Sequence, residues 1–337
     1  MSLIGITMGC PVGIGPEIIL RYFRSTGNSR NHRAVVIGDL EVLRYNATHF
    51  GIPIECVPWQ PGEALPDTGI PVYSVTSLSQ DMLNWGRPSK ETGLAMAGYI
   101  ETAVELAGRG DIDGITTCPI SKIALQRAGY SYPGHTEMLA DLTGEHHFTM
   151  MMAGTSLRVT LVTIHCSVQQ IASQLSIETI LQRIRITHTS LITDFAIPKP
   201  KIAVAGLNPH AGEEGMFGVE ETEIILPAIE QARAANMNVE GPYPPDTVFV
   251  KAAAKEFDAV VCMYHDQGLI PFKLLHFDDG VNVTIGLALV RTSVDHGTAY
   301  DIAGKGVAKA DSLAAAVKMA AEIVENRKKM CNYTLSS

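Results

Sequence analysis

Short apolar runs alternate with longer amphipathic segments along almost the whole chain. The apolar runs have the length of buried strands, and the amphipathic segments repeat their apolar residues every three or four positions, as helices do. The runs predict strands at residues 3–8, 34–38, 114–117, 150–153, 158–164, 201–207, 259–263 and 282–285. The amphipathic segments predict helices at residues 16–24, 41–50, 91–107, 121–128, 177–195, 223–235, 247–255 and 313–328. This alternation is typical of a mixed α/β fold.

Interruptions of the pattern predict how the chain is divided. Residues 53–89 are rich in Pro, Gly and Ser and are expected to be irregular. A break near residues 130–134 and a return near 284–289 indicate a middle lobe inserted into an outer one. A length of 337 residues is sufficient for two such lobes. We expect an outer lobe at residues 1–130 plus 286–337 and a middle lobe at 131–285.

Composition and charge narrow the class of protein. Apolar residues make up 46% of the chain and charged residues 18%, which is ordinary for a compact α/β enzyme. The formal net charge is -9, and Lys and Arg form no block anywhere. A chain without a basic stripe is a poor candidate for binding nucleic acid or an anionic membrane. Any anion that it binds must therefore meet a local cluster of donors.

Cysteine usage and hydropathy predict the compartment. The six cysteines form no CxxC pair: Cys10, Cys56, Cys118, Cys166, Cys262 and Cys331. They predict reduced, mostly buried thiols of the kind found in cytosolic proteins. The first residues are strand-like and lack the basic segment and apolar core of a signal peptide. No apolar run approaches the roughly 20 residues that span a bilayer. We expect a soluble, cytoplasmic protein.

Three histidines each follow one of the predicted strands. His165, His210 and His265 come just after residues 158–164, 201–207 and 259–263. Residues at the carboxyl ends of strands in an α/β sheet converge on one crevice. Three imidazoles there would hold a divalent metal and leave positions open for a substrate. Taken singly, each is better explained as a partly buried structural histidine.

Carboxylates stand beside these histidines in the sequence. Asp266 directly follows His265, and Asp246 lies in a Pro-Pro-Asp-Thr turn. Such groups orient a metal-binding imidazole or act as a general base.

Several segments carry groups that suit an anion. In Gly134-His135-Thr136-Glu137, Thr136 is a natural helix N-cap, and the positive end of the helix favours an anion that the His-Thr pair could bind. The alternative is an ordinary capped helix with a surface histidine. Lys273 and Arg291, with Asn282 between them, suit a phosphate or carboxylate. The alternative is that each cation extends into solvent, which fits the apolar surroundings of Arg291 poorly.

Two loops suit a larger ligand. Residues 9–17 read Gly-Cys-Pro-Val-Gly-Ile-Gly-Pro-Glu, which could approach a ligand with backbone N–H groups or be an ordinary strand-to-helix turn. Residues 295–308 read Asp-His-Gly-Thr-Ala-Tyr-Asp-Ile-Ala-Gly-Lys-Gly-Val-Ala. This second segment resembles the cofactor loop of the isopropylmalate and isocitrate dehydrogenases, in which an acid followed by isoleucine goes with NAD rather than NADP. The chemistry agrees, because a carboxylate accepts from a ribose 2′-OH and repels a 2′-phosphate. One departure is Lys309, where those enzymes carry asparagine. The cofactor contacts then fall on His296, Gly297, Ala299, Asp301 and Ile302.

Together these segments resemble the 4-hydroxythreonine-4-phosphate dehydrogenase family of pyridoxal phosphate biosynthesis, from the first strand to Ala308. The resemblance implies an isocitrate/isopropylmalate-dehydrogenase-like α/β fold with two lobes of mixed sheets flanked by helices. It also implies a homodimer with its active site at the subunit interface. One divalent metal, Zn, Mg, Co or Mn, would be held by His165, His210 and His265, one of them from the partner subunit. Substrate contacts would fall on His135, Thr136, Lys273, Asn282 and Arg291.

The reaction that the resemblance implies is oxidation of a small phosphorylated hydroxy acid with NAD. 4-Phosphohydroxy-L-threonine would be oxidised at its secondary hydroxyl and lose CO₂ to give 3-amino-2-oxopropyl phosphate. Metal binding to the hydroxyl lowers its pKa, and Asp246 or Lys273 would serve as the base or its relay. The sequence does not choose between them.

Departures from the family pattern keep alternatives open. Cys10 and Val12 replace the Asp and Ala that are usual in the first loop. Residues 117–122 and 132–135 look more like the corresponding segments of paralogues that act on 4-phospho-D-threonate or 4-phospho-D-erythronate. Replacing one polar group of a substrate by another changes the specificity of an enzyme strongly if the active site hydrogen-bonds that group. Phosphate acyltransferases share the fold but need neither metal nor nicotinamide. A metal-dependent hydrolase or lyase would leave the cofactor loop without a role, and a catalytically dead nucleotide-binding protein would be expected to lack a metal ligand.

Overall fold

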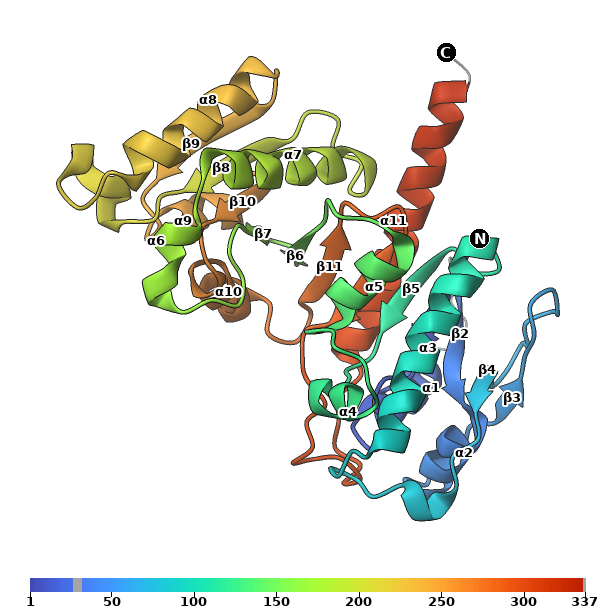
Figure 1. Cartoon of the computed structure of the whole chain (residues 1–337). Coiled ribbons are helices and arrows are strands. Elements are labelled where there is room, and N and C mark those ends of the chain that lie inside the picture. Colours follow the sequence, from blue (N-terminus) through green and yellow to red (C-terminus); the bar gives the residue numbers. More distant parts are fainter. Residues whose placement is uncertain (27–31, 336–337) are drawn as a thin grey trace. The chain divides into compact units, whose positions relative to one another are not determined.

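The chain forms two compact units, each described on its own below (Figure 1). The structure is a computed structural model that describes residues 1–26 and 32–335. The first unit comprises Met1–His146 and Leu287–Glu325, and the second comprises His147–Gly286 and Asn326–Ser337. The assignment of the cofactor to an outer lobe at 1–130 plus 286–337, and of the metal and dimer contacts to a middle lobe, stays a prediction. None of the helices in the described part of the chain is long and apolar enough to cross a membrane.

The first unit is built on a parallel sheet. Its strand order is β3-β4-β2-β1-β5-β12, and all five neighbouring pairs in it are parallel. The strands are β1 (Ser2–Thr7), β2 (His32–Asp39), β3 (Cys56–Pro58), β4 (Ile70–Thr76), β5 (Gly114–Thr117) and β12 (Arg291–Val294). The helices are α1 (Gly15–Thr26), α2 (Leu40–His49), α3 (Lys90–Arg109), α4 (Lys122–Arg127) and α5 (His135–Thr143), with a 3₁₀ turn η1 (Gln80–Met82). Helix α3 packs across β4, β2, β1 and β5. The residues of β1 and β5 are almost all buried, as expected for the inner strands of a parallel sheet.

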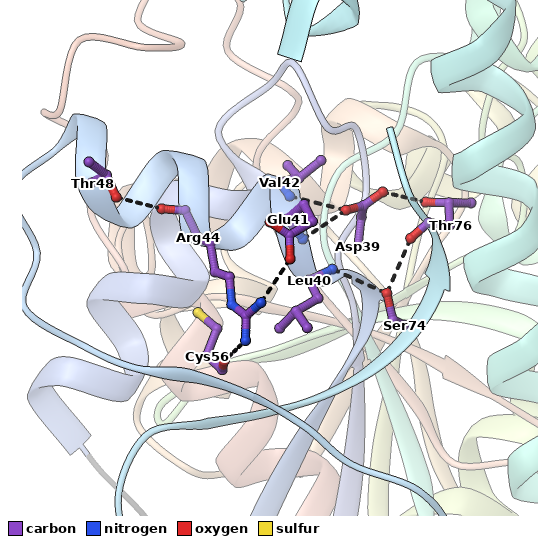
Figure 2. A network of polar contacts seen from close by, with 9 residues as sticks. All are labelled: Asp39, Leu40, Glu41, Val42, Arg44, Thr48, Cys56, Ser74 and Thr76. Carbon is purple, nitrogen blue, oxygen red and sulfur yellow. Dashed lines mark hydrogen bonds and ion pairs between the residues drawn. The ribbon is translucent and has the colours of Figure 1, made fainter. Parts of the chain in front are cut away.

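A buried carboxylate fixes the start of α2 (Figure 2). Asp39, fully buried at the end of β2, accepts hydrogen bonds from the backbone N–H of Glu41 and Val42, each at 3.0 Å. Its other oxygen accepts from Thr76 Oγ1 at 2.8 Å and from the N–H of Leu78 at 2.7 Å. An Asp at this position satisfies the first free N–H groups of the helix. Because both oxygens are used within the fold, Asp39 is a structural residue.

The second unit is built on a mixed sheet. Its strand order is β11-β6-β7-β10-β8-β9; the β11–β6 and β6–β7 pairs are antiparallel and the others parallel. The strands are β6 (Thr149–Ala153), β7 (Arg158–Leu161), β8 (Lys201–Ala205), β9 (Asn238–Tyr243), β10 (Ala259–Cys262) and β11 (Val281–Ile285). The helical elements are η2 (Val168–Gln170), α6 (Ile171–Gln174), α7 (Ile177–Thr193), η3 (Pro209–Gly215), η4 (Glu221–Ile225), α8 (Leu226–Ala234), α9 (Val248–Ala253) and α10 (His265–Leu275). Helix α11 (Asp311–Leu335) contributes residues to both units.

Alternate residues of β7 show how helices cover this second sheet. Val159 and Leu161 belong to a buried apolar cluster with residues of α9 and α10, among them Phe272. Thr160 between them points to the other face, where its Oγ1 accepts from Thr187 Oγ1 of α7 at 3.0 Å. Strand residues alternate between faces, so α7 covers one face and α9 with α10 covers the other. Burial of a side chain such as Phe272 contributes about 1.5–3 kcal/mol and holds α10 against the strand ends.

The α/β class and the eight strands read from the apolar runs are confirmed, with small shifts at their ends. The expectation that residues 53–89 are irregular is wrong, because they contain β3, η1 and β4. The strands β9 and β12 and the helix α10 were also not predicted.

Candidate active site

The three histidines lie where three neighbouring strands end. Strand β10 pairs in parallel with β7 on one side and with β8 on the other. His165 follows β7, His210 lies in the turn after β8, and His265 is the first residue of α10 after β10. Parallel neighbours end at the same edge of a sheet, so all three loops leave the second unit's sheet at one edge.

Two of the imidazoles lie side by side. The ring centroids of His165 and His265 are 6.2 Å apart, and both line a cavity of about 240 Å³ that Cys166, Tyr264 and Asp266 also line. Nδ1 of His265 lies 2.6 Å from Oδ1 of Asp266. A carboxylate on one ring nitrogen fixes the tautomer and leaves the other nitrogen for a ligand. Within the described residues of a single chain, however, no group of three or more His, Cys, Asp or Glu could hold a metal ion.

His210 lies in a left-handed stretch of backbone. The φ angles from His210 to Glu214 run 54°, 54°, 81°, 42° and 56°, and only Gly212 among these residues adopts such angles freely. Residues other than glycine in this region cost on the order of 1–3 kcal/mol each and cluster at functional sites. His210 itself is exposed, so the stretch presents its imidazole at the surface of the unit.

A buried glutamate holds this turn in place. Oε1 of Glu221 accepts from the N–H of Leu207 and of Asn208, each at 2.7 Å, and Oε2 accepts from Nδ2 of Asn208 at 2.9 Å. A Cβ added to Gly212 would lie 2.7 Å from Oε2 of the same residue. Glu221 is 2% exposed. Sequence reasoning missed it, because its role depends on a contact between η4 and the turn after β8 that no local pattern shows.

The other residues expected in the second unit differ in their surroundings. Asn282, on β11, places its Nδ2 3.4 Å from Sδ of Met150, and its Oδ1 is buried without a hydrogen-bond partner. A buried amide oxygen in this state is suited to a donor from a ligand. Lys273 is half-buried on α10, and Asp246 is exposed in the turn after β9.

In the first unit, the buried guanidinium of Arg291 acts electrostatically on the half-buried His135. Arg291, the first residue of β12, is 3% exposed, and its Nη2 donates to Oγ1 of Thr117 at 2.8 Å. Burial lowers the pKa of its guanidinium to about 10, against an opposing effect of Glu137. The pKa of His135 is held well below its ordinary value, mainly by burial and to a smaller extent by the positive charges of Arg291 and Lys122. Nε2 of His135 is buried without a hydrogen-bond partner. An anion would offset this charge and give that nitrogen a partner.

The helix that follows corrects one prediction. Thr136 is not the N-cap of α5: the helix begins at His135, its N-cap is Gly134, and no side chain caps it. Thr136 lies in the first turn. The first N–H groups therefore lack a capping side chain and suit the same anion. Thr117 and Lys122 are not among the predicted site residues. They lie in residues 117–122, the segment whose sequence resembles that of the paralogues.

The loop expected to bind a cofactor is anchored on α1. The N–H of Ala308 donates to Oε1 of Glu17 at 2.9 Å, Nε of Arg21 donates to the same oxygen at 2.9 Å, and Arg21 Nη2 donates to the carbonyl of Gly306. Glu17 is 1% exposed. Buried hydrogen bonds of this kind fix the end of the loop.

Within this loop the predicted cofactor residues are exposed or half-buried, and one of them has a positive φ angle. Asp301 and Gly297 are exposed, and nothing lies within 4 Å of a Cβ added to Gly297. Ala299 has a φ of 43°, and Nδ1 of the half-buried His296 lies 3.1 Å from the carbonyl of Gly297. Ile302 is half-buried. An exposed carboxylate beside open backbone fits the ribose contact expected of NAD.

The first loop packs against the cofactor loop. The N–H of Ile14 donates to the carbonyl of Thr298 at 3.2 Å, and Sγ of Cys10 lies 3.4 Å from the hydroxyl of Tyr300. Cys10 and Val12 are fully buried, and burial raises the pKa of the Cys10 thiol. The two residues that depart from the family pattern therefore lie beneath the cofactor loop.

Comparison with known proteins identifies the family. The profile of the family described as pyridoxal phosphate biosynthetic protein PdxA matches residues 30–320. The chain belongs to the PdxA family.

Relatives within the PdxA family cover nearly the whole chain. A 4-hydroxythreonine-4-phosphate dehydrogenase from Desulfosudis oleivorans is 53% identical over 94% of this chain and 95% of its own length. A putative D-threonate 4-phosphate dehydrogenase from Oceanobacillus iheyensis is 42% identical over 96% and 98%. The crystal structure of a 4-hydroxythreonine-4-phosphate dehydrogenase from Klebsiella pneumoniae superposes with a TM-score of 0.88 at 41% identity, covering 96% of this chain and 98% of that one. This PdxA chain thus has the fold of its solved relative.

Proposed function

We propose that this PdxA-family chain is an NAD- and divalent-metal-dependent dehydrogenase. It oxidises 4-phosphohydroxy-L-threonine at its secondary hydroxyl and releases CO₂, giving 3-amino-2-oxopropyl phosphate and NADH in the biosynthesis of pyridoxal 5′-phosphate. The observation that carries the proposal is the pair His165 and His265, with ring centroids 6.2 Å apart, beside a third strand end that bears His210. Relatives named for this reaction at up to 53% identity support it.

The second unit supplies the metal ligands and candidate proton carriers. His165, His210 and His265 offer imidazole nitrogens, which suit Zn, Co or Ni and also permit Mg or Mn when substrate oxygens complete the shell. The chemistry supplied by a bound divalent metal is polarisation of substrate oxygens, and that supplied by NAD is acceptance of hydride. Asp246 and Lys273 remain the candidates for the base that takes the hydroxyl proton.

The first unit supplies the anion and cofactor contacts. Arg291, with His135 and the first turn of α5, binds the phosphate or the carboxylate of the substrate. Asp301 in the loop anchored by Glu17 accepts from a ribose hydroxyl of NAD.

A second copy of the chain completes the site in this proposal. Four large apolar residues on α10 or just beyond it are exposed by half or more: Ile270 at 60%, Leu274 at 82%, Leu275 at 50% and Phe277 at 76%. Several large apolar side chains exposed on one short segment are suited to a protein interface. A homodimer that covers α10 would bring a histidine of the partner to a group that one chain leaves incomplete.

A second candidate substrate follows from the first loop. Cys10 and Val12 depart from the usual pattern, and a putative D-threonate 4-phosphate dehydrogenase is 42% identical. The alternative reaction is oxidation and decarboxylation of 4-phospho-D-threonate or 4-phospho-D-erythronate. Side-by-side assays of NADH formation with the three acids test the choice, since a site that hydrogen-bonds the 2-amino group discriminates strongly against a hydroxyl.

A further inference from the structure

The side-chain amide of Gln267 joins two of the histidine loops. Its Oε1 accepts from the N–H of Met263 at 2.6 Å, and its Nε2 donates to the carbonyl of Gly206 at 2.7 Å. Met263 directly follows β10, two positions before His265, and Gly206 directly follows β8, in the segment that leads to His210. Gln267 is 7% exposed, so neither bond competes with bulk water.

These bonds continue the sheet beyond the point where its backbone ladder stops. The register of β10 with β8 ends at Val261 and Val204. Beyond these residues the backbone groups of the two loops need other partners, because buried N–H and C=O groups are costly to leave unpaired. Gln267 supplies an acceptor to one loop and a donor to the other, which fixes the spacing between them.

Thr163 makes the corresponding link to the third loop. Its Oγ1 donates to the carbonyl of Met263 at 2.8 Å, and its backbone N–H donates to the same oxygen at 3.1 Å. Thr163 is 6% exposed and lies two positions before His165. The peptide groups around Met263 therefore connect all three loops that carry a histidine.

Close packing of α10 directs Gln267 to this place. A Cβ added to Gly268 would lie 3.0 Å from Cδ2 of Leu161 and 3.1 Å from Sγ of Cys262. Glycine at this position lets the first turn of α10 lie directly on the ends of β7 and β10. The neighbouring Gln267 is thereby buried within reach of both loops.

We propose that Gln267 is a positioning residue for metal binding, an inference that rests on the metal site of the proposed function. It holds the loops of His210 and His265 at a fixed spacing, and Thr163 holds the loop of His165 to them. By fixing both loops on the strand ends of this chain, the hydrogen bonds of Gln267 set the affinity for a divalent cation of the site that a second copy completes, although its side chain is not itself a ligand. Residues that orient metal ligands typically change metal affinity by 10- to 100-fold when replaced.

The test measures binding of Co²⁺ alone to the full chain, without substrate or NAD. In Gln267→Met the side chain keeps its length and loses both bonds, and in Gln267→Glu it keeps an acceptor for Met263 and turns an oxygen toward the carbonyl of Gly206. Both are expected to bind Co²⁺ about 10- to 100-fold more weakly than the wild type, with a changed visible spectrum of the bound ion. Thr187→Val, which removes a buried hydrogen bond on α7 in the same unit, is the matched control and should keep the wild-type affinity and spectrum.

A second pair of variants tests the link if the Gln267 variants do not fold. Thr163→Val removes the hydroxyl bond to Met263 and is expected to weaken Co²⁺ binding, whereas Thr163→Ser keeps the hydroxyl and should restore it. Wild-type affinity and spectrum in Gln267→Met, or in Thr163→Val, would overturn the positioning role while leaving the metal site intact. A wild-type chain that binds no Co²⁺, Zn²⁺ or Mn²⁺ would instead overturn the metal site of the proposed function.

Discussion

Arg291 shows most clearly how a single residue connects this fold to its proposed substrate. A guanidinium that is 3% exposed has lost most of its hydration, and this desolvation lowers its pKa to about 10. Its hydrogen bond to Thr117 orients the group, and its charge acts on His135, whose Nε2 is buried. A phosphate or carboxylate would accept bonds from both residues, so the pair is suited to an anion.

Replacing this guanidinium tests its role in binding. Arg291→Lys keeps the charge but loses the planar fork that pairs with an anion. Hydrogen bonds to charged groups contribute about 1.5–3 kcal/mol, so kcat/KM for the phosphorylated substrate should fall by roughly 10- to 150-fold. Steady-state kinetics measure this, with Arg127→Lys on α4 as an exposed control in the same unit. Equal losses in the two variants would argue against an anion-binding role.

The pH dependence of stability tests the environment of His135. The folded-state pKa is lowered below the unfolded value of about 6.5, so protons bind the unfolded chain preferentially. The contribution of His135 to stability is therefore present above about pH 6.5 and is lost as the pH falls below it. Between pH 8 and pH 5.5 this loss amounts to at most about 1.4 kcal/mol.

Urea unfolding of the wild type and of His135→Asn at both pH values checks this expectation. The wild type should lose more free energy of unfolding than the variant on acidification. Inorganic phosphate should reduce the difference, because an anion bound beside His135 raises its pKa. Identical pH dependence in the two proteins would mean that His135 titrates normally.

At the scale of elements, the sequence predicts the strands well and the turns between them poorly. Strands β7, β8 and β10 are apolar runs, so the position of each histidine after a strand could be predicted. Helix α10 was not predicted, because Gly268 and Pro271 interrupt its pattern. Position 268 favours glycine because Leu161 and Cys262 approach it closely in the folded chain.

The turn after β8 could not be predicted for a related reason. Residues such as His210 and Glu213 disfavour a positive φ, and the turn adopts it under restraint from Glu221. Strand β3 has three residues and Pro71 lies within β4, so neither gives a strong local signal. Thr136 was predicted as a cap from residue type alone, whereas the chain enters α5 through Gly134.

Two glycines of this turn offer a matched pair of variants. Gly212 and Gly215 have φ angles of 81° and 93°. A Cβ added to Gly212 would meet Glu221, whereas a Cβ added to Gly215 would have nothing within 4 Å. Gly215→Ala should cost about 1–3 kcal/mol of stability from backbone strain alone. Gly212→Ala should cost more and should also weaken Zn²⁺ binding, because it displaces the glutamate that holds the turn of His210.

Unfolding in urea and competition for Zn²⁺ with a chelator measure the two effects. Zn²⁺ affinity that falls equally in the two alanine variants would show that Glu221 has no specific part in presenting His210.

At the scale of the whole molecule, the proposal requires a second copy of the chain. Leu274 is 82% exposed, so a charge there costs an isolated chain little stability. Leu274→Glu should convert the homodimer to a folded monomer by placing a desolvated charge in the interface, and NADH formation should be lost with it. Sedimentation velocity measures the oligomeric state, with Leu94→Glu on α3, 47% exposed, as the control expected to remain dimeric. A wild-type chain that sediments as an active monomer would remove the need for a partner histidine.

In the proposed function, the first unit supplies the anion and cofactor contacts and the second unit supplies the histidines. The chain belongs to the PdxA family, and its relatives are named for 4-hydroxythreonine 4-phosphate and for D-threonate 4-phosphate, with which the proposed small phosphorylated hydroxy acid is consistent.

The most direct test of this account is NADH formation by metal-stripped protein to which single divalent metals are returned. The assay compares 4-phosphohydroxy-L-threonine with 4-phospho-D-threonate and 4-phospho-D-erythronate at equal concentration, followed at 340 nm. We expect no reaction without metal, recovery with at least one of Zn²⁺, Co²⁺, Mg²⁺ or Mn²⁺, and the highest kcat/KM for 4-phosphohydroxy-L-threonine. Faster turnover of either other acid would assign the chain to the paralogous reaction. No NADH from any of the three acids with any of these metals would contradict the proposed dehydrogenase.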